Sequence, residues 1–513
     1  MPRFFNTAGP CKPDLHYMLP AQRRIPTVRQ LIDDQSYFVL HAPRQTGKST
    51  ALLALAQELT REGRYTAAWL SMKVGSRERH DPGAAADSML DQWRAMTEVF
   101  LPAELQPPPW PDAPPRRRIG AALGAWAKAS PRPLVVFLDE ADALQDETLL
   151  AVLDQLREGY SLRPTGFPWS LALVGLRDIR DYRTSEGRLG SSSPFNIKVE
   201  SITMRDFTRD EVAELYQQHT DDTGQLFQPD AVDRAFHWTQ GQPWLVNALG
   251  RQLTRVIVPD VAQPITAADV DTAKEILIQR QDTHLDSLAE RLREPRVRRI
   301  VEPILAGTAM PDVADDDRRF VVDLGLLRRS TSGGLEPANP IYKEVIPRVL
   351  AGGPRDTLPH TQAVWLRPEG TLDPDRLIEA FLAVWRQHGE PLLKSAPYHE
   401  VAPQLVLMAF LHRVVNGGGT IDREYAAGSG RMDLCLRFGG AVLGMELKVW
   451  RDGEKDPLES GLTQIDGYLA SLSLDRGWLV IFDRRSGQIP LGERTSASVV
   501  PSPSGRSVVV IRA

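Results

Sequence analysis

The chain has 513 residues, of which 42% are hydrophobic and 25% charged, and its formal net charge is −5 at pH 7. This length predicts three or four domains with sizeable cores, and the slightly acidic balance excludes a protein that coats nucleic acid with its whole surface, although a local basic face remains open. Two distant cysteines, Cys11 and Cys435, indicate neither a disulfide framework nor a zinc site and fit a reducing compartment. No apolar run reaches about 18 residues and no apolar signal segment opens the sequence, so we expect a cytoplasmic protein without a membrane span.

Residues 1–30 are punctuated by proline and are predicted to be irregular. They lead into the first strand of the fold. Three of their side chains, His16, Tyr17 and Arg24, fit either a structural strap or the lining of a site for a nucleotide base.

The stretch YFVLHAPRQTGKST, residues 37–50, has the order that a phosphate-binding loop needs. An apolar strand at 37–40 precedes the pattern A-x-x-x-x-G-K-S, and a helical pattern follows at once. Loop N–H groups and the positive helix end hold phosphates in such a site. We expect Lys48 to reach the β- and γ-phosphates and Ser49 to hold Mg²⁺, although Ala42 stands where the first glycine is usual. The predicted nucleotide-binding residues of the loop are Ala42, Pro43, Arg44, Gln45, Thr46, Gly47, Lys48, Ser49 and Thr50.

Acidic residues follow the next strongly apolar run. The sequence LVVFL at 134–138 predicts a central parallel strand, and Asp139 and Glu140 come directly after it. The carboxyl end of such a strand is where an α/β sheet places its chemistry. We therefore expect Asp139 to bind Mg²⁺ through water or Ser49, and Glu140 to polarise the attacking water; capping of the following helix is the alternative.

The run 169–174 predicts a neighbouring strand that ends near Arg177. Arg177 is the candidate sensor of the γ-phosphate, and an ion pair with Asp178 or Asp181 is the equal alternative. Strands and helices alternate over the first 200 residues, which predicts a parallel sheet covered on both faces.

The chain then becomes helical from 208 to 282, with Gly241 and Pro243 at the start of one helix, where by themselves they indicate only a turn. The segment 284–350 has the pattern of a winged helix, which either binds duplex DNA or packs against protein. Residues 351–374 are rich in Gly, Pro and Thr and predict a linker.

A second chemical site is predicted on a β-hairpin formed by residues 431–436 and 441–449. Glu446 lies thirteen positions after Asp433, and Lys448 lies two positions after Glu446. Glu446 and Lys448 share one face of the strand because strand side chains alternate. The three side chains are therefore expected to converge.

Two carboxylates and a lysine on one face suit metal-assisted cleavage of a phosphodiester. Asp433 and Glu446 would hold Mg²⁺ or Mn²⁺, with the carbonyl of Leu447 as a further ligand. Lys448 would position the water or stabilise the developing charge. The alternative is an amphipathic hairpin with a surface Glu/Lys pair, but here the charges interrupt an otherwise apolar strand.

With these residues in view, the chain resembles a prokaryotic family of AAA-like ATPases of the STAND class that is fused to a C-terminal nuclease-like domain. The resemblance covers nearly the whole chain and rests on RFFNTAGP (3–10), HYMLP (16–20), APRQTGKS (42–49), FLDEAD (137–142), GLRDIRDY (175–182), SPFNI (193–197), GQPWLVNAL (241–249) and ANPIYKEVIPR (338–348). It implies that Gly241 and Pro243 contact nucleotide near its base and couple it to the position of a lid. It also implies a nucleotide-driven switch that often oligomerises when triggered.

The C-terminal part is similar to the PD-(D/E)xK nuclease superfamily, which also includes inactive members. Asp433, Glu446 and Lys448 fall on its core motif, and Met432 stands where the name-giving proline would be. The accessory residues that the resemblance implies are Glu400, which matches the first acidic position, and Gln464 and Tyr468, which match a Gln-x-x-x-Tyr helix. Gln464 and Tyr468 share a helix face and either orient the site or lie at a core edge.

These observations predict an α/β protein, a P-loop parallel-sheet ATPase with a helical lid and a winged helix, followed by a restriction-endonuclease-like α/β domain. The expected boundaries are 1–200 for the ATPase core, 201–283 for the lid, 284–352 for the winged helix, 353–371 for the linker and 372–513 for the PD-(D/E)xK nuclease-like domain.

The function we expect is an ATP-binding and ATP-hydrolysing switch that controls a metal-dependent DNA nuclease. ATP and Mg²⁺ belong to the first site, and Mg²⁺ or Mn²⁺ to the second. Nucleic acid, DNA first, is the expected partner, with homo-oligomerisation on ATP binding and, from the resemblance alone, a role in defence against foreign DNA. The alternatives are a signalling or scaffold ATPase whose nuclease-like domain only binds nucleic acid, and a repair or mobile-element ATPase that remodels DNA.

Overall fold

In the computed structural model the chain divides into two compact units, Met1–His284 with Ala314–Ile341 and Leu285–Val313 with Tyr342–Ala513. The structure describes residues 3–179, 183–184, 187–188, 197, 200–280, 290–306, 310, 312–330, 333–350, 364–395, 402–415, 419–427 and 430–513. Within these ranges no helix is both long enough and apolar enough to span a bilayer. The expected domain boundaries remain predictions, since the segment expected to form a winged helix contributes residues to both units.

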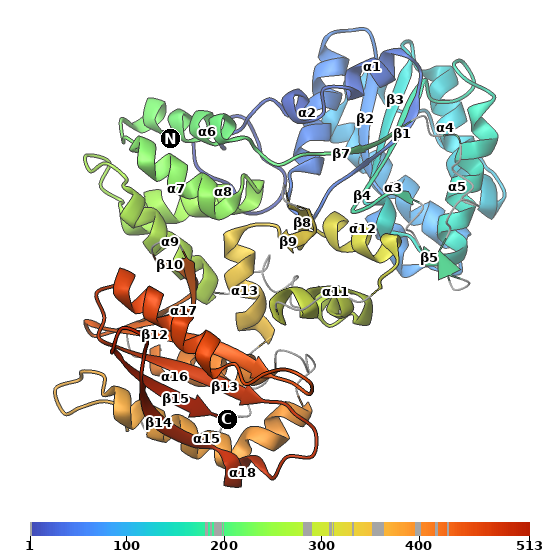
Figure 1. The fold of residues 1–513 in the computed structure, drawn as a ribbon. Helices are drawn as coiled ribbons and strands as arrows, with labels where there is room; N and C mark the ends of the chain where they lie inside the picture. Colours follow the sequence, from blue (N-terminus) through green and yellow to red (C-terminus); the bar gives the residue numbers. More distant parts are fainter. Residues whose placement is uncertain are drawn as a thin grey trace. The chain divides into compact units, whose positions relative to one another are not determined.

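The first unit is built on a five-stranded parallel sheet in the order β2-β3-β4-β1-β7, which confirms the predicted parallel sheet (Figure 1). Its strands are β1 (Tyr37–His41), β2 (Thr66–Ser71), β3 (Leu134–Asp139), β4 (Ser170–Gly175) and β7 (Glu200–Thr203). Residues of β1, β3 and β4 are buried throughout, as expected of strands that are covered on both faces. Since β4 lies between β1 and β3, the ends of these three strands meet at one edge of the sheet.

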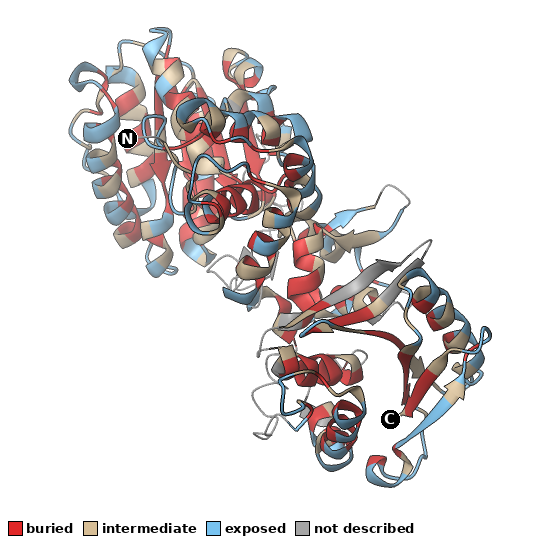
Figure 2. Cartoon of the chain, turned by 90° about the vertical axis from the view of Figure 1, so that its left-hand side faces the viewer, coloured by how far each residue is buried: buried red, intermediate tan, exposed pale blue. Residues whose placement is uncertain are grey.

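Helices cover both faces of this sheet and make two cores. The helices are α1 (Val28–Asp33), α2 (Lys48–Arg61), α3 (Pro82–Phe100), α4 (Arg118–Ala129) and α5 (Asp146–Tyr160). Residues of α3, α4 and α5, among them Trp93 and Trp126, pack with one set of alternating strand side chains. Residues of α1 and α2 pack with the other set. Figure 2 shows buried residues gathered on the strands and on the helix sides that face them.

The irregular N-terminal segment differs from prediction because part of it is helical. A 3-10 turn, η1 (Ala21–Arg24), and helix α1 precede the first strand. Val28 and Ile32 are buried in α1, and they pack against the sheet core. Apolar side chains at this helical spacing give the short helix its stability.

The predicted helical segment after the sheet is present. It consists of α6 (Arg209–Thr223), α7 (Pro229–Thr239), α8 (Pro243–Gln252), a π-helical turn η8 (Leu253–Ile257) and α9 (Ala267–Arg280). Thr208 and Glu211 form a reciprocal capping box at the start of α6, and prolines begin α7 and α8. We call α6 to α9 the lid helices. Helix α12 (Asp315–Asp323) and the antiparallel pair β8 (Leu327–Arg329) and β9 (Leu335–Pro337) complete the first unit.

Two short strands, β5 (Arg183–Thr184) and β6 (Gly187–Arg188), form an antiparallel pair after β4. Besides η1, short 3-10 turns lie in the described connections of the first unit. They are η2 (Lys73–Arg77), η3 (Ala103–Leu105), η4 (Pro115–Arg117) and η5 (Ala141–Ala143).

The second unit is built on a six-stranded mixed sheet in the order β10-β11-β12-β13-β15-β14. Its elements are α11 (Pro295–Ala306), α13 (Pro340–Leu350), α15 (Pro374–Ser395), α16 (Ala402–Val415), β10 (Gly419–Ala427), β11 (Gly430–Phe438), β12 (Ala441–Trp450), α17 (Leu458–Ser471), β13 (Arg476–Asp483), α18 (Leu491–Arg494), β14 (Ser496–Pro501) and β15 (Ser507–Arg512). Strands β10, β11 and β12 pair antiparallel, whereas β12, β13 and β15 pair parallel.

The mixed sheet has helices on both faces. Ile465 and Leu469 of α17 pack against Leu479 and Ile481 of β13 on one face. On the other face the ring of Trp385 on α15 lies 5.3 Å from that of Phe482. Successive side chains of β13 therefore point alternately toward α17 and toward α15. A residue of β12 or β15 points to the same face as the β13 residue with which it pairs.

Candidate nucleotide-binding site

The predicted phosphate-binding loop connects β1 to α2. Gln45 and Gly47 have positive φ angles of 58° and 85°, so the loop turns back before α2 begins at Lys48. A Cβ on Gly47 would lie 3.4 Å from Nη1 of Arg24, in a backbone conformation that favours glycine. The loop thus presents backbone N–H groups beside the positive end of a fourteen-residue helix, which is an anion-binding arrangement.

The Lys48 ammonium lies inside this loop. Its Nζ donates to the carbonyl oxygens of Ala42 and Pro43, each at 2.7 Å. Burial lowers the pKa of Lys48 to about 8, against a partial opposing effect of Asp139. An anionic phosphate at the loop would favour the charged ammonium.

Ser49 and Asp139 meet at the predicted magnesium position. Oγ of Ser49 donates to Oδ2 of Asp139 at 2.6 Å, and Nε1 of Trp69 donates to the same oxygen at 3.0 Å. A hydroxyl and a buried carboxylate are hard oxygen donors, so this pair fits Mg²⁺. The contact also joins the end of β3 to the first turn of α2.

Glu140 stands beside this pair in a left-handed conformation, with φ of 60°. Its side chain makes no capping hydrogen bond to the following turn; Oε2 instead accepts from Oγ of Ser71 at 2.6 Å. Nζ of Lys73 lies 3.7 Å from Oε1. A left-handed conformation at a residue other than glycine is a frequent feature of functional sites.

Arg177 follows β4, between the strands that carry the loop and the acidic pair. Its guanidinium lies 5.0 Å from the ring centroid of Phe320 on α12. The sensor role of Arg177 remains a prediction. Its position ties the end of β4 to α12.

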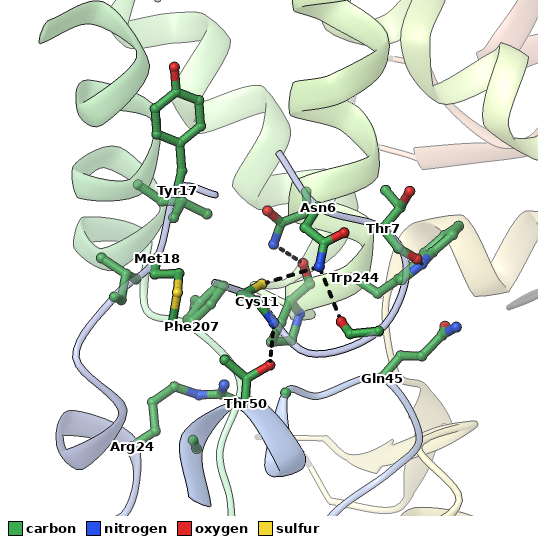
Figure 3. A pocket seen from close by; sticks show the side chains of 17 residues that line it. Asn6, Thr7, Cys11, Tyr17, Met18, Arg24, Gln45, Thr50, Phe207 and Trp244 are labelled. Atoms are coloured by element: carbon green, nitrogen blue, oxygen red, sulfur yellow. Dashed lines mark hydrogen bonds between the residues drawn. The ribbon is translucent and has the colours of Figure 1, made fainter. Parts of the chain in front are cut away.

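A cavity of about 150 Å³ lies beside the loop, and side chains from the N-terminal segment, the loop and the lid helices line it (Figure 3). It is lined by Asn6, Thr7, Gly9, Cys11, Tyr17, Met18, Leu19, Arg24, Gln45, Gly47, Thr50, Ala51, Phe207, Leu215, Pro243, Trp244 and Asn247. Tyr17 and Arg24 thus belong to the lining, as one of the two sequence interpretations held, whereas His16 is not part of it. The largely apolar rim next to a phosphate loop suits a nucleotide base.

Arg24, which lines the cavity, holds the phosphate-binding loop through a hydrogen bond. It donates to the carbonyl oxygen of Thr46 at 2.7 Å and, through Nε, to that of Arg205 at 2.7 Å. Its guanidinium lies 4.8 Å from the ring centroid of Phe207, and burial lowers its pKa to about 10. The side chain stays charged at neutral pH and joins the loop to the segment that precedes the lid.

The turn before α8 brings the lid against the loop. Nε2 of Gln242 lies 3.5 Å from the carbonyl oxygen of Gln45, and Nε1 of Trp244 donates to that of Thr7 at 2.9 Å. Nδ2 of Asn247 donates to the carbonyl of Pro243 at 2.8 Å, which leaves its buried Oδ1 without a hydrogen-bond partner among the described residues. An acceptor beside the cavity is therefore available to a ligand.

Gly241 leaves no room for a side chain. Its φ is +79°, and a Cβ there would lie 1.9 Å from the carbonyl oxygen of Phe207. We expect Gly241→Ala to lower the free energy of unfolding of the first unit by about 2–4 kcal/mol and to weaken nucleotide binding. Chemical denaturation followed by tryptophan fluorescence measures this. Gly224→Ala is the matched control, because Gly224 has a similar φ but an open site; an equal effect of both changes would contradict the steric argument.

Nucleotide affinity is expected to fall above pH 8. The pKa of Lys48 lies at about 8 in the nucleotide-free protein, and a bound phosphate raises it because the phosphate stabilises the charged form. The favourable contact is fully present below the free pKa and is lost as the pH rises, so affinity should drop about tenfold between pH 7 and pH 9. Titration calorimetry at both pH values tests this. Lys48→Arg should remove the slope, since arginine stays charged.

The α12–β9 segment, residues 314–341, contacts the nucleotide site at several points. A Cβ on Gly325 would lie 2.7 Å from Cβ of Pro43, and Nη1 of Arg328 donates to Oε1 of Gln240 at 2.6 Å. Oδ1 of Asp323 lies 4.0 Å from Nδ1 of His41. One short segment thus touches the phosphate loop, the end of β1 and the lid turn.

The structure also brings the predicted hairpin residues together in the second unit. Oδ2 of Asp433 accepts from the N–H of Leu447 at 2.8 Å, and Nζ of Lys448 donates to Oε1 of Glu446 at 2.8 Å. Lys448 also contacts the side-chain oxygen of Gln464 on α17. Glu400 lies outside the described residues. Tyr468 lies four positions after Gln464 on α17 and is partly buried.

Glu446 is the most buried of these groups. It is 3% exposed, and its Oε2 has no hydrogen-bond partner among the described residues. Burial first, and then the charge of Asp433, raise the pKa of Glu446 to about 7. Nowhere in the described ranges do three or more His, Cys, Asp or Glu side chains gather as a metal cluster. Two carboxylates with a free buried oxygen nevertheless fit one divalent cation.

Several site residues were not predicted from the sequence. Met18, Phe207, Trp244 and Asn247 line the cavity. Three of them lie in the stretches 16–20 and 241–249 that carry the resemblance, but none was named as a binding residue. The sequence signal that was available is the run Gly241–Asn247, in which a polar residue interrupts an apolar helix start.

No family model and no curated protein matches this chain. Among solved structures, it is similar to the Walker-type ATPase paby2304 of Pyrococcus abyssi, with 13% identity, 67% of this chain and 99% of that chain covered, and a TM-score of 0.49. It is also similar to the RuvB Holliday junction branch migration motor of Thermotoga maritima, with 15% identity, 63% and 93% covered, and a TM-score of 0.33. The ORC2 protein of Aeropyrum pernix has 12% identity, 64% and 90% covered, and a TM-score of 0.40. Since all three scores are below 0.5, the interpretation of the site rests on the residues themselves.

Proposed function

We propose that the first unit binds and hydrolyses ATP with Mg²⁺. The observation that carries this proposal is the 2.6 Å contact between Ser49 and Asp139, next to the buried ammonium of Lys48. A lysine, a hydroxyl and a carboxylate at the end of a parallel strand are the parts that phosphoryl transfer needs. The metal would neutralise charge on the β- and γ-phosphates, while Lys48 and the loop N–H groups position them.

The adjoining cavity supports an adenine base. Apolar and aromatic side chains such as Met18 and Phe207 offer it a face to pack on. Oδ1 of Asn247 is an acceptor, and adenine presents an amino group where guanine presents an oxygen. An acceptor without a partner therefore favours adenine over guanine.

The turnover of ATP tests the role of Glu140. We expect Glu140→Gln to keep ATP affinity and to slow hydrolysis by about 10²–10³-fold, because the amide does not accept the proton of the attacking water. Steady-state phosphate release and equilibrium binding measure the two effects separately. Glu147→Gln, on the exposed side of α5, is the control. Unchanged turnover in Glu140→Gln would remove Glu140 from the mechanism.

We infer that the ATP site is a switch. The α12–β9 segment contacts Pro43, Gln240 and Arg177, which belong to three different parts of the site. A nucleotide that moves any of these parts changes the fit of the segment. Such differential contact is what a ligand needs to shift a conformational equilibrium. Oligomerisation on ATP binding belongs to the same proposal.

We further propose that the second unit is a metal-dependent nuclease, with DNA as the first substrate to test. Support comes from Asp433, Glu446 and Lys448 on one hairpin and from the buried, unpartnered Oε2 of Glu446. The two carboxylates would hold Mg²⁺ or Mn²⁺, which supplies an activated water when bound. Lys448 would hold that water or the phosphate. A role in defence against foreign DNA follows only from the resemblance of the whole chain.

A cleavage assay tests this second proposal. The full chain is given linear and circular DNA, single- and double-stranded, and RNA, with Mg²⁺ or Mn²⁺ and with or without ATP. We expect cutting that ATP changes and that Lys448→Ala abolishes, while the exposed control Lys455→Ala leaves it intact. Binding without any cutting would favour the signalling or scaffold ATPase instead, and DNA-stimulated ATP turnover without cutting would favour a remodelling ATPase.

A further inference from the structure

A second cavity, of about 120 Å³, lies in the second unit at the carboxyl ends of β13 and β15. It is lined by Trp385 of α15, by Asp483, Arg484 and Arg485 at the end of β13, and by Arg494 of α18, with Pro403 of α16 and Ala513 just after β15 among the further residues. The carboxyl ends of parallel strands are where α/β sheets hold ligands. The cavity is thus placed as a binding site would be.

This cavity is separate from the hairpin carboxylates. Glu446 and Lys448 pair with Leu479 and Ile481 of β13, whose side chains pack on α17. Phe482, the next residue, packs instead on Trp385 of α15 and lines the cavity. The cavity lies at the carboxyl end of β13 and shares no lining residue with the proposed nuclease site, so the failure of one proposal leaves the other standing.

Buried donors at this cavity have no acceptor. Trp385 is a fully buried side chain, and its Nε1 has no hydrogen-bond partner among the described residues. The same holds for Nε and Nη1 of Arg494. Buried N–H groups are almost always hydrogen-bonded, so each exception needs an explanation. Three such donors around one cavity indicate that an acceptor belongs there.

The charge of the lining side chains has a positive surplus. Arg485 donates to both oxygens of Asp483, at 3.0 and 2.7 Å, so that carboxylate is already paired. Nη1 of Arg494 lies 3.9 Å from Oδ2 of Asp483, too far for a hydrogen bond. Arg484 adds a third cation to the lining. The arginine side chains of the lining therefore outnumber its one carboxylate side chain, Asp483, which favours an anion over a cation.

We propose that this cavity binds a phosphate group, either as the free ion or as the terminal monoester of a nucleotide. Its volume of about 120 Å³ is large enough for a phosphate group. Arginine and indole N–H groups are donors only, so they select an oxyanion over a cation or a neutral donor. The phosphate would accept from Arg494 and Trp385, and Arg484 would neutralise its outer oxygens.

Titration calorimetry with inorganic phosphate tests the proposal on the full chain. The phosphate loop is silenced by Lys48→Ala, and the other substitutions are made in that background. We expect saturable binding with a dissociation constant below about 10 mM, which Arg494→Gln weakens at least tenfold. Trp385→Phe keeps the ring packing and removes only the N–H, so we expect a loss of several-fold. Arg506→Gln, whose arginine is already paired with Asp466, should change nothing.

Thymidine monophosphate and thymidine are titrated in the same way to identify the source. Binding of the monophosphate at least as tight as that of phosphate, with none for thymidine, assigns a terminal monoester, and binding of phosphate alone assigns the free ion. No saturable binding to the Lys48→Ala chain, or equal binding to Arg494→Gln and Trp385→Phe, would show that the cavity holds only water and would overturn the proposal.

Discussion

Replacing Lys48 by alanine is expected to abolish nucleotide binding. Its Nζ is held by two carbonyl oxygens of the loop at 2.7 Å, at the point where β- and γ-phosphates would lie. Charge-assisted contacts to phosphate are the strongest polar contacts available here, so we expect a loss of affinity of at least about a hundredfold. Titration with ATP, and with a fluorescent analogue at low protein concentration, measures it.

Loss of the ammonium also affects the loop itself, because the carbonyl oxygens of Ala42 and Pro43 lose their hydrogen-bond donor. A variant that keeps the charge is therefore needed to separate the loss of charge from a change in the loop. Lys48→Arg keeps the charge with a different shape and should retain part of the affinity. Lys128→Ala, near the end of α4, is the control for loss of any one lysine. Normal ATP affinity in Lys48→Ala would show that this loop is not the nucleotide site.

The phosphate-binding loop was predictable because its signals are contiguous. Strand, loop and helix occupy residues 37–61 without interruption, and the torsions of Gln45 and Gly47 are what that chain direction requires. The partner Asp139 was predictable for a related reason. A buried strand that ends in a carboxylate places it at the same sheet edge as the loop, whichever strands lie between.

The lining of the adjoining cavity was not predictable in the same way. Asn6, Met18, Phe207 and Asn247 come from segments up to 241 positions apart, and no local pattern relates them. Their meeting depends on how the N-terminal segment and the lid helices pack. One long-range link is the buried hydrogen bond, 3.1 Å long, between the hydroxyl of Tyr17 and the ring of His219 on α6.

The β11–β12 hairpin was predictable only in part. Period-two alternation was enough to place Glu446 and Lys448 on one face, and the structure keeps them 2.8 Å apart. The carbonyl of Leu447 as a metal ligand stays a prediction, and the structure adds that the N–H of Leu447 donates to Asp433 across the hairpin. That contact depends on the register of β11 against β12, which the sequence pattern alone does not determine. Its consequence is that Asp433 has a structural task in addition to the metal-binding role that we propose for it.

For this reason Asp433→Asn is a better test than Asp433→Ala. Asp433→Asn keeps an oxygen that accepts from the N–H of Leu447 and removes the negative charge, whereas Asp433→Ala removes both. We expect Asp433→Asn to keep the hairpin intact and to reduce DNA cleavage by at least about a hundredfold, since a neutral amide is a poor ligand for a hard divalent cation. Cleavage of the preferred DNA from the assay above measures this, and ATP affinity serves as the control for the distant site.

A direct metal titration gives a readout that does not depend on cleavage. Mn²⁺ binding, followed by calorimetry or by electron paramagnetic resonance, should weaken about 10–100-fold in Asp433→Asn. Gln464→Ala is a useful comparison, because Gln464 contacts Lys448 and no carboxylate, so metal affinity should hardly change. Full cleavage and unchanged Mn²⁺ affinity in Asp433→Asn would place any nuclease site elsewhere, and the hairpin would then be a structural edge of the sheet whose Glu446–Lys448 pair merely satisfies a buried charge.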